Sequence, residues 1–187
     1  EEESSGKNGL NSVLKHLPKL DCAIVGEPTL MQLAIAEKGL LVLDVIVKGT
    51  PSHAAHQNED NPIYNAIPVI EWFNSFKFEK ISEQLGPVKM TVTQINAGKQ
   101  HNVVPSQCDL VVDIRVNDCY TNSEILAIIK KQLTAEINPR SMHLNASSIP
   151  VAHGLVQAGI ALGRTTYGSP TLSDQSVLSC QSLKLGP

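Results

Sequence analysis

Carboxylate side chains occur at two places in the sequence where they could act together. The chain opens on Glu1-Glu2-Glu3, and Glu27 follows directly after the apolar run 21–25. Neighbouring carboxylates suit a site where one group binds a metal ion and another takes a proton from metal-bound water. An acidic run can equally be a solvated surface segment, and Gly26-Glu27-Pro28 can be a simple turn. The carboxylates alone leave both interpretations open.

Histidine, asparagine and arginine side chains form a second group of candidates. His53 lies in a loop after an expected strand, and His56 follows three residues later, so the two could bind a metal ion. Each could equally be an exposed loop histidine. Asn102 follows a turn and precedes an apolar pair, a pattern that also fits a plain connection between strands. Arg115 faces away from the apolar side of its strand and could bind a carboxylate or pair with Asp113.

The overall composition is that of an ordinary folded protein. Of the 187 residues, 42% are hydrophobic and 18% charged, and the formal charge is −3. Basic residues are scattered and aromatic residues make up 4%, so nucleic-acid binding is not expected. No apolar run reaches the roughly 18 residues of a membrane helix, and no signal-peptide pattern opens the chain. With four widely spaced cysteines that suit a reducing compartment, these features predict a cytoplasmic protein.

The central part of the sequence predicts a compact module. Alternating apolar residues over 41–47, 88–92 and 108–116 favour half-buried strands. Asn61-Pro62 begins a helix, and the capping box at 121–124 begins another that should run to about Ile137. A last short strand is expected at 142–146. Strand, helix, strand, strand, helix, strand is the split βαβ, ferredoxin-like arrangement, with two helices on one face of an antiparallel sheet.

The two flanks of this module have α/β character. We expect a short helix over 9–17, a buried strand over 21–25, a helix over 153–163 and a turn near 168–174. The simplest organisation is an α/β domain, formed by 1–39 and 149–187, with the module 40–148 inserted. The chain begins without methionine and stops just after an apolar stretch, so we expect it to be a fragment of a longer protein.

Several short motifs together resemble those of one enzyme family. They are Glu-Glu-Glu-x-Ser-Gly at the start, Val25-Gly26-Glu27-Pro28-Thr29, Lys48-Gly49-x-x-Ser52-His53-Ala54-Ala55, Asn61-Pro62, Asn102-Val103-Val104-Pro105 and Asp113-Ile114-Arg115. In type and order they resemble the di-zinc aminoacylase and carboxypeptidase family, which includes acetylornithine deacetylase and succinyl-diaminopimelate desuccinylase. The acetylornithine deacetylase-like branch is the most similar. The resemblance covers essentially the whole chain.

The resemblance implies a fold and a set of residue roles. The flanks would form part of a zinc-aminopeptidase-like catalytic domain, and the inserted module would be a lid that dimerises. Glu2 would be the general base, Glu3 a ligand of one zinc ion and Glu27 a ligand of the other, with cobalt or manganese as alternatives. His53 would reach into the active site of the partner subunit and bind the developing oxyanion. The implied substrate-binding residues are Asn102, Arg115, Thr171, Ser173 and Asp174.

The implied activity is removal of an acyl group from an N-acyl amino acid or small peptide by a metal-dependent amidohydrolase. The family also needs a His-x-Asp motif and a bridging aspartate before Glu1 and a histidine after Pro187, none of which is in this sequence. We therefore expect these 187 residues alone to bind little zinc and to be inactive. The alternatives are a non-catalytic dimerisation module and a ligand-binding regulatory domain of ferredoxin-like type, which would leave the acidic opening and Gly-Glu-Pro unexplained.

Overall fold

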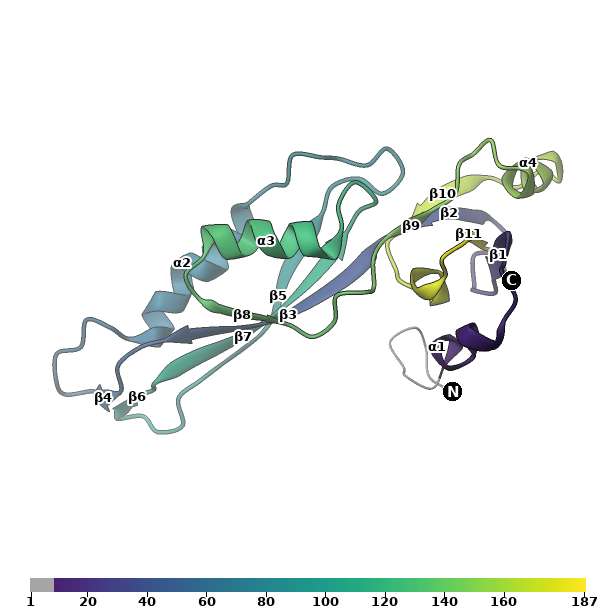
Figure 1. Cartoon of the computed structure of the whole chain (residues 1–187). Helices are drawn as coiled ribbons and strands as arrows, with labels where there is room; N and C mark the ends of the chain where they lie inside the picture. The colour runs from purple at the N-terminus through teal and green to yellow at the C-terminus, as the bar shows by residue number, and fades with distance from the viewer. Residues whose placement is uncertain (1–8) are drawn as a thin grey trace.

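The structure is a computed structural model that describes residues 9–187, and these residues build two main sheets placed end to end (Figure 1). One sheet has the order β5-β7-β3-β8 and is called here the antiparallel sheet. The other has the order β1-β11-β2-β10, with β9 also paired to β2, and is called the mixed sheet. The chain passes from the mixed sheet into the antiparallel sheet and back again, as expected for an inserted module.

The antiparallel sheet has the predicted βαββαβ order. Its strands are β3 (Gly39–Lys48), β5 (Lys89–Ala97), β7 (Gln107–Val116) and β8 (Glu136–Pro139), and each neighbouring pair is antiparallel. Helices α2 (Pro62–Ser75) and α3 (Asn122–Gln132) pack on one face, where Ala66, Phe73 and Ile129 join the strand side chains in one core. The ferredoxin-like prediction is therefore confirmed.

Local sequence explains why these elements begin where they do. Buried and less buried residues alternate along β3 and β7, so one face of each strand contributes its Leu, Val and Ile side chains to the core. The Asn61 side chain accepts a hydrogen bond from the Ile63 backbone N–H at 3.0 Å and caps α2. Thr121 and Glu124 form a reciprocal capping box that begins α3.

The mixed sheet has a smaller apolar core. Its parallel pairs are β1 (Cys22–Val25) with β11 (Gln181–Lys184) and β2 (Leu33–Glu37) with β10 (Thr166–Ser169). The strand β2 also pairs antiparallel with β11 and with β9 (Ser147–Ser148). Helix α4 (Gly154–Ala161) packs Val156 against the core residues Leu33, Ile35, Ile149 and Leu183. The remaining elements are α1 (Leu10–Val13) and the 3₁₀ turns η1 (Leu14–His16) and η2 (Asp174–Val177).

The loop 76–88, between α2 and β5, contacts both sheets. Lys38, at the end of β2, donates a hydrogen bond from Nζ to the Pro87 carbonyl at 2.7 Å. Asn117 is fully buried and donates from Nδ2 to the carbonyl of Gly86 at 2.8 Å. At its tip, the Gln84 backbone packs on Gly168 of β10 so closely that a Cβ atom at position 168 would overlap it. The loop therefore links the module to the mixed sheet.

Three expectations about individual elements are wrong. Strand β1 is the exposed edge of its sheet, with Ile24 53% exposed, because it pairs on one side with β11 only. Helix α3 ends at Gln132, where Leu133 is already extended, and Ile137 points into the core from β8, because β8 pairs with β3. The last strand of the module is accordingly β8 and not 142–146.

The apolar side chains of α2 are only partly buried. Ala66 and Phe73 are buried, whereas Ile63 is 38% and Ile67 51% exposed. The helix continues through Pro68, because the apolar face anchors it on both sides of the proline.

The helices of residues 9–187 include none with the length and apolar character that spanning a lipid bilayer requires.

Candidate functional site

The predicted residues His53 and Asn102 lie side by side at the end of the module farthest from the mixed sheet. The short strands β4 (Ser52–His53) and β6 (Val103–Val104) pair there, as Figure 1 shows, with His53 opposite Val103. The Ala54 N–H donates to the Asn102 carbonyl at 3.0 Å, which fixes the two loops together. The sequence separates these residues by almost fifty positions, and the strand pairing brings them together.

The hydrogen bonding of His53 defines what its ring can do. The Ala55 backbone N–H donates to Nδ1 at 3.1 Å, so Nδ1 is an acceptor. In a neutral ring this places the proton on Nε2, which is left to donate a hydrogen bond. The His53 side chain is exposed, and its ring lies 5.8 Å from that of His56 in an edge-on arrangement. Such a donor suits an oxyanion or another acceptor that approaches from outside this chain.

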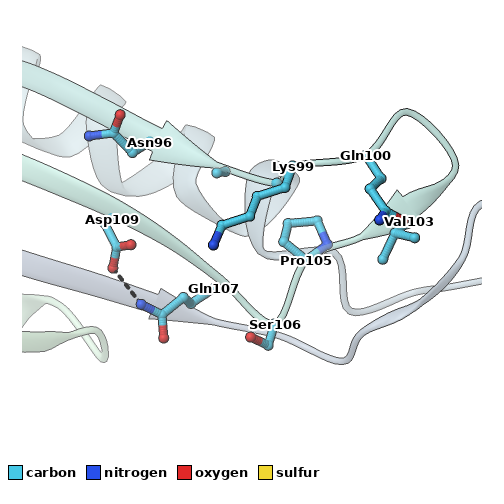
Figure 2. A pocket seen from close by; sticks show the side chains of 10 residues that line it. Asn96, Lys99, Gln100, Val103, Pro105, Ser106, Gln107 and Asp109 are labelled. Atoms are coloured by element: carbon cyan, nitrogen blue, oxygen red, sulfur yellow. Dashed lines mark hydrogen bonds between the residues drawn. The ribbon is translucent and has the colours of Figure 1, made fainter.

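A cavity that the sequence did not predict lies beside this tip. It has a volume of about 630 Å³ and opens between the ends of β5 and β7 (Figure 2). Lys99 extends into the space between the strand ends, and Gln107 donates from Nε2 to Asp109 Oδ1 at 2.7 Å. Polar and apolar side chains both line the cavity, and they form no recognisable sequence motif. The lining includes Asn96, Lys99, Gln100, Val103, Pro105 and Asp109.

Arg115 lies at the opposite end of the antiparallel sheet, close to the mixed sheet. Its guanidinium forms a two-point contact with Asp113, Nε–Oδ1 at 2.8 Å and Nη2–Oδ2 at 3.0 Å. Lys89 is its cross-strand neighbour on β5. Burial, together with the nearby charge of Lys89, lowers the pKa of the Lys38 ammonium. This end of the sheet is thus rich in cations and only partly neutralised by Asp113.

The turn that carries Thr171, Ser173 and Asp174 leads from β10 to η2, at the end of the mixed sheet nearer the module (Figure 1). The Ser173 hydroxyl donates to Glu37 Oε2 at 2.7 Å, and that oxygen lies 3.1 Å from Lys184 Nζ. Burial raises the pKa of the Glu37 carboxyl despite these partners. Ser173 therefore points inward to a carboxylate, and Thr171 is exposed. Sequence patterns did not indicate Glu37 or Lys184 as site residues, because charged residues on short apolar strands usually lie at the surface.

The structure does not assemble a metal site from the residues it describes. Glu2 and Glu3 lie outside the described residues 9–187. Glu27 is half-buried just after β1, and no group of three or more His, Cys, Asp or Glu side chains suited to a metal ion occurs within 9–187. A zinc ion needs about four ligands, so Glu27 and its described surroundings do not fit one by themselves.

The predicted residues thus form two separate groups. His53 and Asn102 share the distal tip, whereas Arg115 and the turn 169–174 lie at the junction of the two sheets. From Gln107 to Arg115 alone, β7 rises about 26 Å. No single amino-acid-sized molecule can span both groups within one chain.

Comparison with known proteins finds a matching family model and similar curated proteins. The family model described as the peptidase dimerisation domain, M20_dimer, matches residues 35–140. Succinyl-diaminopimelate desuccinylase of Wigglesworthia glossinidia brevipalpis is 29% identical over 147 residues, which cover 70% of this chain and 39% of that protein. The same-named protein of Acidiphilium cryptum (strain JF-5) is 27% identical over 141 residues, 70% of this chain and 38% of that protein. The chain therefore spans about two fifths of the length of these curated relatives.

Solved structures share the fold at lower identity. A tripeptidase from Staphylococcus aureus subsp. aureus Mu50 aligns with a TM-score of 0.71 and 17% identity, over 97% of this chain and 52% of that one. A protein of Bacillus subtilis, described as a dinuclear metal binding peptidase from the M20 family, aligns with a TM-score of 0.55 and 14% identity, over 88% of this chain and 47% of that one. Since the matched segment 35–140 covers more than half of the sequence, this chain belongs to the family defined by the M20 peptidase dimerisation domain.

Proposed function

We propose that this chain is part of a metal-dependent amidohydrolase of the M20 type, which removes an acyl group from an N-acyl amino acid and works as a homodimer. The dimer would form through the module of the antiparallel sheet. The relatives named succinyl-diaminopimelate desuccinylase support an N-succinyl substrate. The acetylornithine deacetylase-like motifs support an N-acetyl substrate, so the acyl group is the first property to measure.

The separation of the two groups of predicted residues carries this proposal. His53, with Nε2 free to donate, projects from the distal tip, whereas Arg115 lies at the other end of the antiparallel sheet, opposite Leu40 of β3. A substrate carboxylate bound by Arg115 could meet a His53 side chain only from a second copy. This geometry supports a site shared between subunits, in which one chain supplies Arg115 and the partner supplies His53 and Asn102.

The exposed surface of the module offers a contact area for a second copy. On α2, Ile63, Tyr64 and Ile67 are 38%, 68% and 51% exposed. On the neighbouring edge strand β5, which pairs only with β7, Ile95 is 55% exposed. Apolar side chains next to an unpaired strand edge favour association. We propose that this surface forms the homodimer.

The proposed cofactor is a pair of zinc ions, with cobalt or manganese as alternatives. Its support is the description of the Bacillus subtilis structure as a dinuclear metal binding peptidase. Glu2, Glu3 and Glu27 are the proposed contributions of this chain, and the described residues do not complete a site without further ligands. We expect the 187 residues alone to bind little zinc and to show no hydrolysis.

Mixed dimers test the shared site directly. In the complete open reading frame, His53→Ala and Arg115→Gln should each abolish hydrolysis of N-succinyl-L,L-diaminopimelate or N-acetyl-L-ornithine. Equal mixtures of refolded subunits should recover about one quarter of the parent activity, because half of the dimers carry one intact site of two. No recovery, with dimers confirmed by sedimentation, would show that His53 acts within its own chain. Metal content measured on the same samples tests the zinc proposal.

A non-catalytic dimerisation module is the second candidate. It is favoured by the family match, which is confined to 35–140 and describes the dimerisation domain of a peptidase. Dimers without bound metal and without hydrolysis, in both the 187 residues and the complete open reading frame, would support this candidate over the enzyme.

A further inference from the structure

A buried ion pair lies beneath the turn 169–174, and neither of its residues belongs to a motif that resembles the enzyme family. Lys184 Nζ, on β11, is 3.1 Å from Glu37 Oε2, on β2. The two side chains are 4% and 0% exposed. The other ion pairs formed by Lys48, Arg115 and Arg140 are all considerably more exposed. A charge pair this deeply buried therefore needs an explanation.

The hydrogen bonds of the pair run to the turn. Lys184 Nζ donates to Ser169 Oγ at 2.8 Å and to the Thr171 carbonyl at 3.0 Å. The ammonium therefore fixes Ser169 and Thr171 relative to each other. Ser173 Oγ donates to Glu37 Oε2 at 2.7 Å and accepts from the Gln175 N–H at 3.3 Å. The Glu37 carboxylate thus binds Ser173, the residue that caps η2. Together, Glu37 and Lys184 contact the turn at Ser169, Thr171 and Ser173.

Besides the pair, local hydrogen bonds hold the turn: Ser169 Oγ donates to the Thr171 carbonyl at 3.2 Å, and Ser176 Oγ donates to the Ser173 carbonyl at 2.9 Å. Residues 170–173 belong to no helix or strand, and Thr171 is exposed. The cores of the two sheets include no residue between 170 and 175. Within 9–187, Asp174 Oδ1 is buried and has no hydrogen-bond partner, so this carboxylate oxygen does not help to hold the turn. A segment of this kind adopts one conformation only when polar contacts specify it.

We propose that Glu37 and Lys184 are positioning residues, which fix the turn 169–174 so that Thr171 and Asp174 are presented to the substrate. Ser173 belongs to the same positioning network, because its hydroxyl is committed to Glu37. This inference rests on the proposed function for what the turn binds. Replacing a buried ion pair by neutral side chains of similar volume is often neutral for stability, so the benefit of the pair lies in the geometry that it imposes.

Single and double variants separate positioning from stability. Glu37→Gln leaves the Lys184 ammonium buried without a counter-charge, and Lys184→Met does the same to the Glu37 carboxylate. At pH 7, Lys184→Met should lower the melting temperature by about 10 °C and Glu37→Gln by less, because burial raises the pKa of Glu37 and the parent already bears the cost of its ionisation. The double variant Glu37→Gln/Lys184→Met removes both charges and should recover most of this loss. It cannot restore the donors to Ser169 and Thr171, so the turn should stay loose.

Amide hydrogen exchange measures local opening of the turn separately from global stability. In the double variant, the amides of 171–175 should exchange about tenfold faster than in the parent, the equivalent of roughly one lost hydrogen bond, while the amides of β7 are unchanged. Asp44→Asn, which breaks the exposed pair of Asp44 with Arg140, is the matched control and should leave the turn unchanged. Parent-like exchange at 171–175 in a stable double variant would overturn the proposal.

The substrate readout is the Michaelis constant of the complete open reading frame. Against N-succinyl-L,L-diaminopimelate, the stable double variant should raise KM about tenfold and change kcat much less, because binding geometry and not the reacting groups is affected. An unchanged KM beside a loosened turn would refute the link to the substrate. If the parent shows no hydrolysis at all, the proposed function fails, and the exchange result still decides whether the pair positions the turn.

Discussion

The antiparallel sheet and the mixed sheet are held together in different ways. The antiparallel sheet buries one continuous apolar cluster between its strands and two helices, from Leu41 to Ile137. The mixed sheet buries five apolar residues in its cluster and, beside them, the polar groups of Glu37, Ser173, Gln175, Ser182 and Lys184. A closed apolar core needs no further partner, whereas buried polar groups depend on complete hydrogen bonding.

The unsatisfied polar atoms follow the same division. Among the described residues, Glu37 Oε1, Ser147 Oγ, Asp174 Oδ1 and Gln175 Oε1 are buried without a hydrogen-bond partner, and all four lie in or beside the mixed sheet. Among the described residues of the module, Asn122 Oδ1 is the only buried polar side-chain atom without a hydrogen-bond partner. The comparison indicates that apolar packing dominates the interior of the module, whereas buried polar groups, some of them unpaired, are concentrated around the mixed sheet.

The largest expected effect tests the self-contained core. Leu43 is fully buried at the centre of β3, so Leu43→Ala should destabilise the chain by about 3 kcal/mol through lost apolar burial and the cavity left behind. Ile95→Ala, at an exposed position on β5, is the control and should change stability by less than about 0.5 kcal/mol. Urea unfolding followed by circular dichroism measures both. Equal effects would show that the core is not where the module derives its stability.

The next effect tests how tightly the two regions are joined. Gly168 of β10 lies against the Gln84 backbone in the loop 76–88, and a methyl group there must push two main-chain segments apart. Gly168→Ala should therefore cost about 2 kcal/mol. Gly154→Ala, where a Cβ meets nothing within 4 Å, is the control. If the loop contact is dispensable, both variants will unfold at the same urea concentration.

The sequence predicted the module far better than it predicted the mixed sheet. Strict alternation over β3 and β7 and the caps at Asn61 and Thr121 are local signals, and each specified its element correctly. Ile137 was wrongly placed in a helix because positions 125, 129, 133 and 137 also fit a helical spacing, and only the pairing of β8 with β3 decides between the two.

The candidate site was predictable only in part. Motif order identified His53, Asn102 and Arg115, but their separation into two groups depends on the length of β7 and on the pairing of β4 with β6. Glu37 and Lys184 were missed because their pairing joins positions far apart in the chain. The roles of all the predicted site residues stay predictions, those of His53, Asn102 and Arg115 included, and so do the domain boundaries at 39/40 and 148/149.

Two carboxylates, one in each region, should give opposite pH dependences. The pKa of Glu37 is raised by burial, so its contribution to stability is full below about pH 4 and decreases as the pH rises through its folded-state pKa. Hydrogen bonds from Arg140 lower the pKa of Asp44, so its contribution is present above about pH 4 and is lost as the pH falls through the lowered value.

Stability differences from parent, measured for Glu37→Gln and Asp44→Asn between pH 3 and pH 7, check these signs. The Asp44 effect should stay below about 1 kcal/mol, because the pair is exposed to solvent. The advantage of the parent over Asp44→Asn should grow with pH, and that over Glu37→Gln should shrink. Parallel slopes would mean that burial does not distinguish the two carboxylates.

The substitution with the smallest expected effect on stability, Ile67→Asp, should have the clearest effect on dimer formation. Ile67 is 51% exposed on α2, so Ile67→Asp should change the stability of the folded chain by less than about 0.5 kcal/mol. A charge in the centre of an apolar contact would nevertheless weaken a dimer by at least about tenfold, because the carboxylate must lose its hydration. Sedimentation velocity at tens of micromolar distinguishes the two species. Ile24→Asp, at the similarly exposed edge β1 of the mixed sheet, should leave assembly unchanged, and the reverse pattern would place the interface on the other region of the molecule.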